Sequence, residues 1–124
     1  MLRVGVFLCC LLACLLQGCR NSSPSVVREI AGLKSRTTAP GGYLTHSSTP
    51  ITQGYELRAT WQINTGLSPT GYFAWIRRRL DGYRVDAEGT NWLMFVRRLE
   101  GDTYTLRISS DGGVALLNFT ARPD

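Results

Sequence analysis

Cysteine is missing from most of this chain. All four cysteines lie within the first nineteen residues, so residues 20–124 contain none. That stretch therefore forms no disulfide within itself, no cysteine-based zinc site and no Cys/His catalytic pair. The only histidine is His46, so a metal site built from several imidazoles is also excluded.

Sequence patterns typical of enzymes are scarce. The chain has no GxGxxG, no P-loop and no HExxH. A Ser-His-Asp triad would need His46, which lies in a Ser/Thr/Pro-rich segment unsuited to the geometry of acyl transfer. Asp86 and Glu88 are the nearest approach to a hydrolytic carboxylate pair, but a solvated turn explains them better. We expect a protein that is not an enzyme and has no cofactor or metal; a hydrolase is the least favoured alternative.

Lysine is nearly absent from the part of the chain after the first nineteen residues. The whole chain has 14 Lys and Arg against 9 Asp and Glu, and Lys34 is the only lysine. The planar guanidinium of arginine suits carboxylates and phosphates better than an ammonium does. A modest basic surplus fits contact with anionic lipid or acidic polymers, and it equally fits an ordinary solvated surface. The candidate anion-binding residues are Arg77, Arg78, Arg79, Arg97 and Arg98.

The N-terminus has the layout of an export signal. Arg3 supplies a positive charge, and an apolar run from Val4 to Leu16 follows it. That run is shorter than the roughly 20 residues that a membrane-spanning helix needs. We therefore exclude this segment from the fold and expect it to direct export.

The residues after this run carry a resemblance. Leu16-Gln17-Gly18-Cys19 resembles the lipobox of bacterial lipoproteins, although Gln17 stands where a small residue is usual. The resemblance implies that residues 1–18 are a signal peptide and that Cys19 bears lipid, with fatty acid such as palmitate, which anchors the protein to the membrane. Arg20 is not the Asp that commonly retains such proteins in the inner membrane. The implied location is the bacterial cell envelope, on the outer membrane facing the periplasm in a two-membrane cell, away from nucleic acid.

Residues 19–53 are predicted to be the lipidated cysteine followed by a tether. Their Ser, Thr, Pro and Gly content is too high to bury much apolar surface. One short helix over 24–34 interrupts this composition, with Ser23 as its cap and Pro24 at its first position. Val26, Val27, Ile30 and Leu33 are predicted to fall on one side of it and would need a surface to pack against.

Residues 54–122 are predicted to form one globular domain. Tyr55 to Ile63 alternate apolar and polar residues, which indicates a strand with one buried face. Ser68-Pro69 favours a helix over 69–80, although a strand competes there. Further strands are expected at 83–87, 92–96, 104–108 and 114–120, with a hairpin at Asp111-Gly112.

The order of these elements predicts an α+β fold. We expect an antiparallel sheet of four to five strands with one helix packed on it; a small all-β barrel or sandwich is the alternative. The strands at 92–96 and 114–119 are apolar on both faces, but one helix covers only one face. The other face could be covered by the 26–33 segment, by barrel closure, or by an envelope protein or a second copy. The favoured role is therefore a protein-interaction module, with binding of anionic lipid or cell-wall polymer through the arginines as the alternative.

The lipobox resemblance generates the first testable prediction. A Cys19→Ser protein is expected to incorporate no fatty acid in metabolic labelling, because the thiol that accepts the diacylglyceryl group is gone. The unchanged chain is expected to incorporate label. Label in the Cys19→Ser protein would contradict lipidation at this position.

Overall fold

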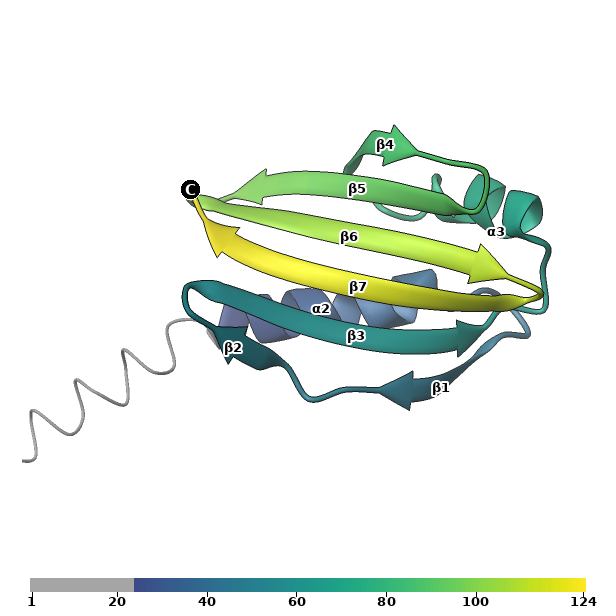
Figure 1. Ribbon diagram of the computed structural model, residues 1–124, viewed down its shortest axis with the longest axis horizontal. Helices are drawn as coiled ribbons and strands as arrows, with labels where there is room; N and C mark the ends of the chain where they lie inside the picture. Colours follow the sequence, from purple (N-terminus) through teal and green to yellow (C-terminus); the bar gives the residue numbers. More distant parts are fainter. Residues whose placement is uncertain (1–23) are drawn as a thin grey trace, which may run out of the picture.

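The computed structural model describes residues 24–124 (Figure 1). The predicted signal peptide, the lipid-bearing Cys19 and the Ser23 cap lie outside these residues. The elements, in chain order, are α2 (Pro24–Thr37), β1 (Tyr43–Ser47), β2 (Ile51–Gln53), β3 (Glu56–Asn64), α3 (Pro69–Ile76), β4 (Arg84–Glu88), β5 (Trp92–Leu99), β6 (Asp102–Asp111) and β7 (Val114–Pro123).

All strands belong to one antiparallel sheet. The order is β1-β3-β7-β6-β5-β4, and β2 pairs with β3 beyond the end of β1. The prediction of an α+β fold with an antiparallel sheet is confirmed, but the predicted four to five strands are too few, because the sheet has seven. The two additional strands are β1 and β2, whose residues are all exposed. Edge strands with no buried face lack the alternation that marks a strand in a sequence.

The edge formed by β1 and β2 is interrupted. Between them Ser48 bonds to Thr60 of β3 through both its backbone and its side chain: the Ser48 amide donates to the Thr60 carbonyl at 2.9 Å, and the Ser48 hydroxyl accepts from the Thr60 amide at 3.0 Å. Pro50 lies two residues further on and has no backbone N–H to donate. A serine side chain thus takes the place of a ladder bond where the edge changes from one strand to the next.

Helix α2 packs on one face of the sheet, called the inner face from here on (Figure 1). Val26, Ile30 and Leu33 are buried, as the helical spacing predicted, but Val27, predicted on the same side, is exposed. The helix continues to Thr37, beyond the expected end at residue 34. Residues 24–53 are therefore part of the folded domain and not the tether that their composition indicated, because the apolar side of α2 finds the sheet to pack against.

Thr37 joins α2 to two other elements. The Trp61 indole N–H of β3 donates to the Thr37 hydroxyl at 3.1 Å, and the Tyr72 hydroxyl of α3 donates to the Thr37 carbonyl at 2.7 Å. All three residues are buried. Both large aromatic side chains thus satisfy their polar atoms inside the core on the C-terminal turn of α2.

Helix α3 also lies on the inner face. Its presence confirms that the 69–80 segment forms a helix and not the competing strand. The Ser68 hydroxyl caps its start by accepting from the Gly71 amide at 3.2 Å. The helix ends at Ile76, four residues before Leu80, and the backbone amides of Arg78 and Arg79 bond three residues back rather than four. This tighter turn ends the helix but keeps Leu80 in the core.

The opposite face of the sheet, called the open face, is not covered by any helix among residues 24–124 (Figure 1). Leu93, Phe95, Leu117 and their neighbours at alternate positions point inward and are buried. Leu116 points the other way and is 45% exposed. The prediction that β5 and β7 are buried on both faces is therefore wrong: their second apolar rows lie on the open face. Of the three covers considered, α2 packs on the inner face, and the sheet is open rather than a barrel or sandwich.

The packing of α2 generates a stability prediction. Leu33→Ala is expected to lower the free energy of unfolding by about 2–5 kcal/mol, because the side chain is 0% exposed and its loss leaves a cavity between α2 and the sheet. Val27→Ala, on the same helix but 48% exposed, is the matched control and is expected to cost little. Urea unfolding of the three proteins measures both effects. Equal stability of the Leu33→Ala protein and the control would mean that α2 is not docked.

Candidate functional site

The open face is identified by the strand register, because residues paired across an antiparallel sheet point to the same side. One row runs from His46 through Gln62, Leu116 and Ser109 to Trp92. The adjacent rows contain Thr, Asn and Ser side chains together with Met94 and Val96. Polar side chains therefore cover β3 and β6 on this face. The apolar side chains lie on β5 and at the start of β7: Trp92, Met94, Val96, Val114 and Leu116.

Basic residues outnumber acidic ones on this face. The strand register assigns it five arginines and two acidic residues: Arg58, Arg84, Arg98, Arg107, Arg122, Glu56 and Asp111. Glu56 is already paired with Arg58 at 2.8 Å. The remaining face is thus a positive surface with little internal compensation.

Trp92 is the first residue of β5 and lies on the open face. The guanidinium of Arg107 stacks over its ring at 5.0 Å from the centroid, a cation–π contact between neighbouring strands. Met94 lies beside both residues on the same face, opposite Arg107 in the register. Arginine, tryptophan and methionine are the residue types that protein interfaces favour, whereas lysine is depleted there.

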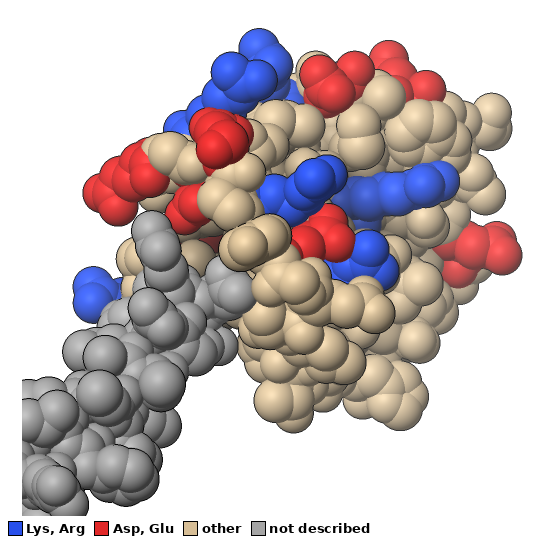
Figure 2. All heavy atoms as spheres, turned by 60° about the vertical axis from the view of Figure 1, so that its left-hand side comes forward, with Lys and Arg blue, Asp and Glu red and all other residues tan. Residues whose placement is uncertain are grey.

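Charged side chains do not extend over the whole surface. Figure 2 brings the left-hand end of Figure 1 forward and shows basic and acidic side chains interleaved in its upper part, with uncharged side chains below. The lower part belongs to the β1, β2 and β3 side, because the view is turned about the vertical axis. There Ile51 is exposed, and Tyr55 in the turn after β2 is 81% exposed.

The predicted anion-binding residues on α3 and its turn do not form a common site with those on β5. Arg77 forms an exposed ion pair with Glu88, and Arg79 stacks over Trp75 at 5.4 Å from the ring centroid. Arg78 is exposed. Glu88 is therefore engaged by an arginine, and the candidate carboxylate pair with Asp86 becomes a surface ion pair at an edge strand.

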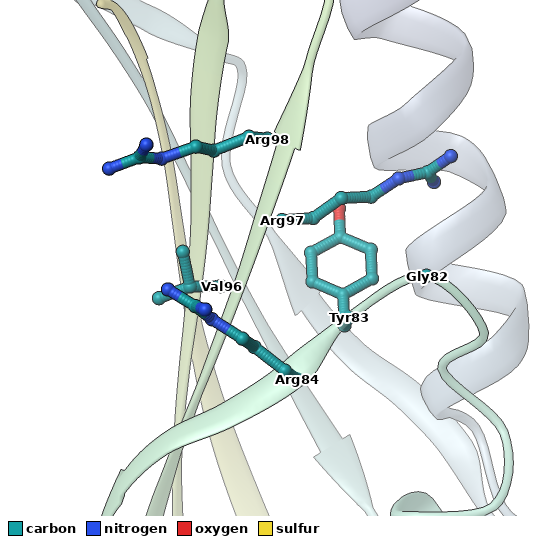
Figure 3. A pocket seen from close by; sticks show the side chains of 6 residues that line it. All are labelled: Gly82, Tyr83, Arg84, Val96, Arg97 and Arg98. Atoms are coloured by element: carbon teal, nitrogen blue, oxygen red, sulfur yellow. The ribbon is translucent and has the colours of Figure 1, made fainter.

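A hollow of about 510 Å³ lies where β4 begins and β5 ends (Figure 3). The residues that line it are Gly82, Tyr83, Arg84, Val96, Arg97 and Arg98. Arg97 and Arg98 were predicted from the sequence, whereas Arg84 was missed. It stands alone in the sequence and joins Arg98 only through the pairing of Arg84 with Val96.

The three arginines of the hollow divide between two sides of the sheet edge. In Figure 3 the side chains of Arg84 and Arg98 extend to one side, and Arg97 extends to the other, toward α2. Arg97 is partly buried and stacks over the ring of Tyr83 at 5.7 Å. Only Arg84 and Arg98 therefore present their guanidinium groups on the open face.

Glu29 of α2 holds Arg97 in this orientation. One carboxylate oxygen, Oε1, meets Arg97 at 3.4 Å, Arg36 at 3.2 Å and the Tyr83 hydroxyl, which donates at 2.9 Å. Burial of the Tyr83 ring, and then its hydrogen bond to Glu29, raises the pKa of the phenol above its ordinary range. This cluster joins α2 to the β4–β5 edge, and its contacts engage Arg97 within the fold.

The described residues offer no metal centre and no membrane span. Within residues 24–124, no three His, Cys, Asp or Glu side chains lie close enough to hold a metal ion. No helix in that range has the length and apolarity to cross a bilayer. His46 lies exposed on the edge strand β1.

Comparisons with known proteins place the chain in no family. No family model, no curated protein and no solved structure matches it. The site therefore has to be understood from its own geometry.

The Glu29 cluster generates a prediction about alkaline pH. The unfolded chain releases the Tyr83 proton near pH 10, whereas the folded chain retains it, so the free energy of unfolding falls as pH rises above that value. Tyr83→Phe is expected to make this fall less steep. At pH 7 the variant is expected to be about 1 kcal/mol less stable, because the hydrogen bond to Glu29 is lost.

Urea unfolding at pH 7 and at several values between about pH 9 and 11 measures both effects. Tyr55→Phe, in an exposed turn, is the control at pH 7 and is expected to leave stability unchanged. An equally steep alkaline decline in the Tyr83→Phe protein would show that the phenol is not held in its protonated form by the fold.

Proposed function

We propose that this protein is a lipid-anchored, non-catalytic binding module of the bacterial envelope. Its folded domain docks an acidic protein on the open face of the sheet, and Cys19 supplies the anchor. The observation that carries this proposal is a sheet face that no helix of residues 24–124 covers, with surplus positive charge and an arginine–tryptophan stack on it. Large exposed patches of this kind mark interaction sites more often than inert surface.

The composition of the face favours a protein as the occupant. Trp92 and Met94 are apolar side chains on the β5 part of this face, and Arg107 stacks on the tryptophan, so the guanidinium is pre-positioned for a carboxylate. Half-buried aromatic residues ringed by polar residues are typical of interface hot spots. The hydroxyl and amide side chains along β3 and β7 are suited to the polar rim.

A second copy of the chain is a poorer occupant than an acidic partner. A two-fold dimer places the same patch on both sides of the interface. Here that arrangement opposes arginine to arginine, because Glu56 is already paired and Asp111 lies at a strand end. Like charges buried together cost several kcal/mol, so the surplus charge favours a partner of opposite sign.

The anchor restricts where such a partner can be. Residues 20–23 are all that separates Cys19 from the start of α2, and a fully extended chain spans at most about 3.6 Å per residue. The domain therefore operates within roughly one domain radius of the lipid surface, rather than at the end of the long tether expected from composition. An envelope protein with an acidic surface near the membrane fits this position.

The proposal predicts that charge reversal at the centre of the face weakens docking. Arg107→Glu is expected to weaken partner binding about tenfold or more, because a carboxylate then faces an acidic surface. Arg78→Glu makes the same change in net charge on an exposed turn away from this face, and it is expected to have little effect.

Photo-crosslinking in cells supplies the measurement. A photoreactive residue at position 116 of the open face is expected to form one discrete adduct with an acidic envelope protein, and Arg107→Glu is expected to remove that adduct. The same group at position 27, on the exposed side of α2, is the positional control. Equal adducts from both positions, or an adduct that survives Arg107→Glu but not Arg78→Glu, would contradict docking on this face.

A further inference from the structure

Arg84 and Arg98 form an uncompensated pair of like charges at one corner of the open face. Arg84 of β4 lies opposite Val96 of β5, and Arg98 is two residues after Val96 on β5. Arg84 and Arg98 are therefore diagonal cross-strand neighbours, a relation in which the residue positions are about 7–8 Å apart. Within residues 24–124 neither has an ion pair. Two neighbouring cations without a counter-ion destabilise the sheet that holds them, and a bound anion would relieve this repulsion.

The surroundings of this pair suit an anion. The hollow that both arginines help to line has a volume of about 510 Å³, and no acidic residue lines it (Figure 3). Thr105, opposite Val96, places a hydroxyl on the same face. Thr103, opposite Arg98, is already engaged, because its hydroxyl donates to Asp124. Asp124 is therefore near Arg98, but it does not line the hollow.

We propose that Arg84 and Arg98, with the Thr105 hydroxyl, bind a phosphate group. A guanidinium fork donates two parallel hydrogen bonds to phosphate oxygens, and a phosphate has enough oxygens to serve two forks and a hydroxyl at once. Arg97 does not take part directly. It faces the other side, where Glu29 and Tyr83 hold it and fix the end of β5 that carries Arg98.

The corner lies at the end of the domain where α2 begins. Arg97, adjacent to Arg98, contacts Glu29 in the second turn of α2, and the start of α2 lies at the same end of the sheet as the close of β5 (Figure 1). If Cys19 is lipidated, the phosphate of a bilayer headgroup is within reach, so this source of the phosphate rests on the proposed anchor. The site itself does not rest on it, and a soluble phosphate has the same chemistry.

The test uses the full chain, ¹⁵N-labelled, in neutral detergent micelles at constant salt. Inorganic phosphate is titrated in one arm and short-chain phosphatidylglycerol in the other, while the side-chain Nε–Hε resonances of arginine are followed by NMR. We expect saturable shifts at Arg84 and Arg98. Arg84→Gln and Arg98→Gln are each expected to weaken the binding about tenfold, since a charge-assisted pair is removed.

Arg58→Gln is the matched control, because Arg58 lies on the same face but is neutralised by Glu56, and it is expected to leave binding unchanged. Shifts from phosphatidylglycerol alone support the site with a headgroup as the source. Shifts from inorganic phosphate support the site whether or not Cys19 is lipidated. A negative result for lipidation would therefore be distinguishable from a negative result for the phosphate site. No saturable shift in either arm, or equal weakening by Arg58→Gln, would overturn the proposal.

Discussion

The contact on which the rest of the fold depends is the seating of α2 at Thr37. Its hydroxyl and carbonyl receive the indole of Trp61 and the hydroxyl of Tyr72, the largest side chains of the core. Those two bonds allow bulky aromatic residues to be buried without an unpaired polar atom, which would cost about 1–3 kcal/mol each. Because α2 and α3 both pack on the inner face, no helix among the described residues covers the open face.

The open face and its chemistry follow from that distribution. A sheet with both helices on one side exposes every second residue of its central strands, whatever those residues are. Here they are hydroxyls and amides near β3, an arginine–tryptophan stack over β5 and β6, and a pair of unpaired arginines at the β4–β5 corner. The Glu29 cluster then separates two arginines that are adjacent in sequence: Arg97 turns inward to the fold and Arg98 outward to solvent.

Much of this fold could be predicted from local pattern, and the exceptions have physical causes. The alternation in β3, the Ser68-Pro69 start of α3 and the turn at Asp111-Gly112 are local signals, and the structure agrees with each. The two edge strands and the docking of α2 depend on contacts that are distant in the chain, so composition alone assigned residues 24–53 to a tether. The candidate site likewise depends on contacts between residues that are distant in the chain. Arginine runs were visible at 77–79 and 97–98, but the partner of Arg98 is Arg84, which only the β4–β5 register reveals.

The interruption at Ser48 also limits how the sheet can associate. A continuous edge offers a row of free amides and carbonyls on which another strand can add, which is the usual route to edge-to-edge aggregation. Here one edge is split by Ser48 and Pro50, and at the other edge the β4 pairing is broken by a register shift between Val85 and Ala87. Neither edge is a good template for growth, so association by adding a strand to an edge is disfavoured, and the broad face is left for partners.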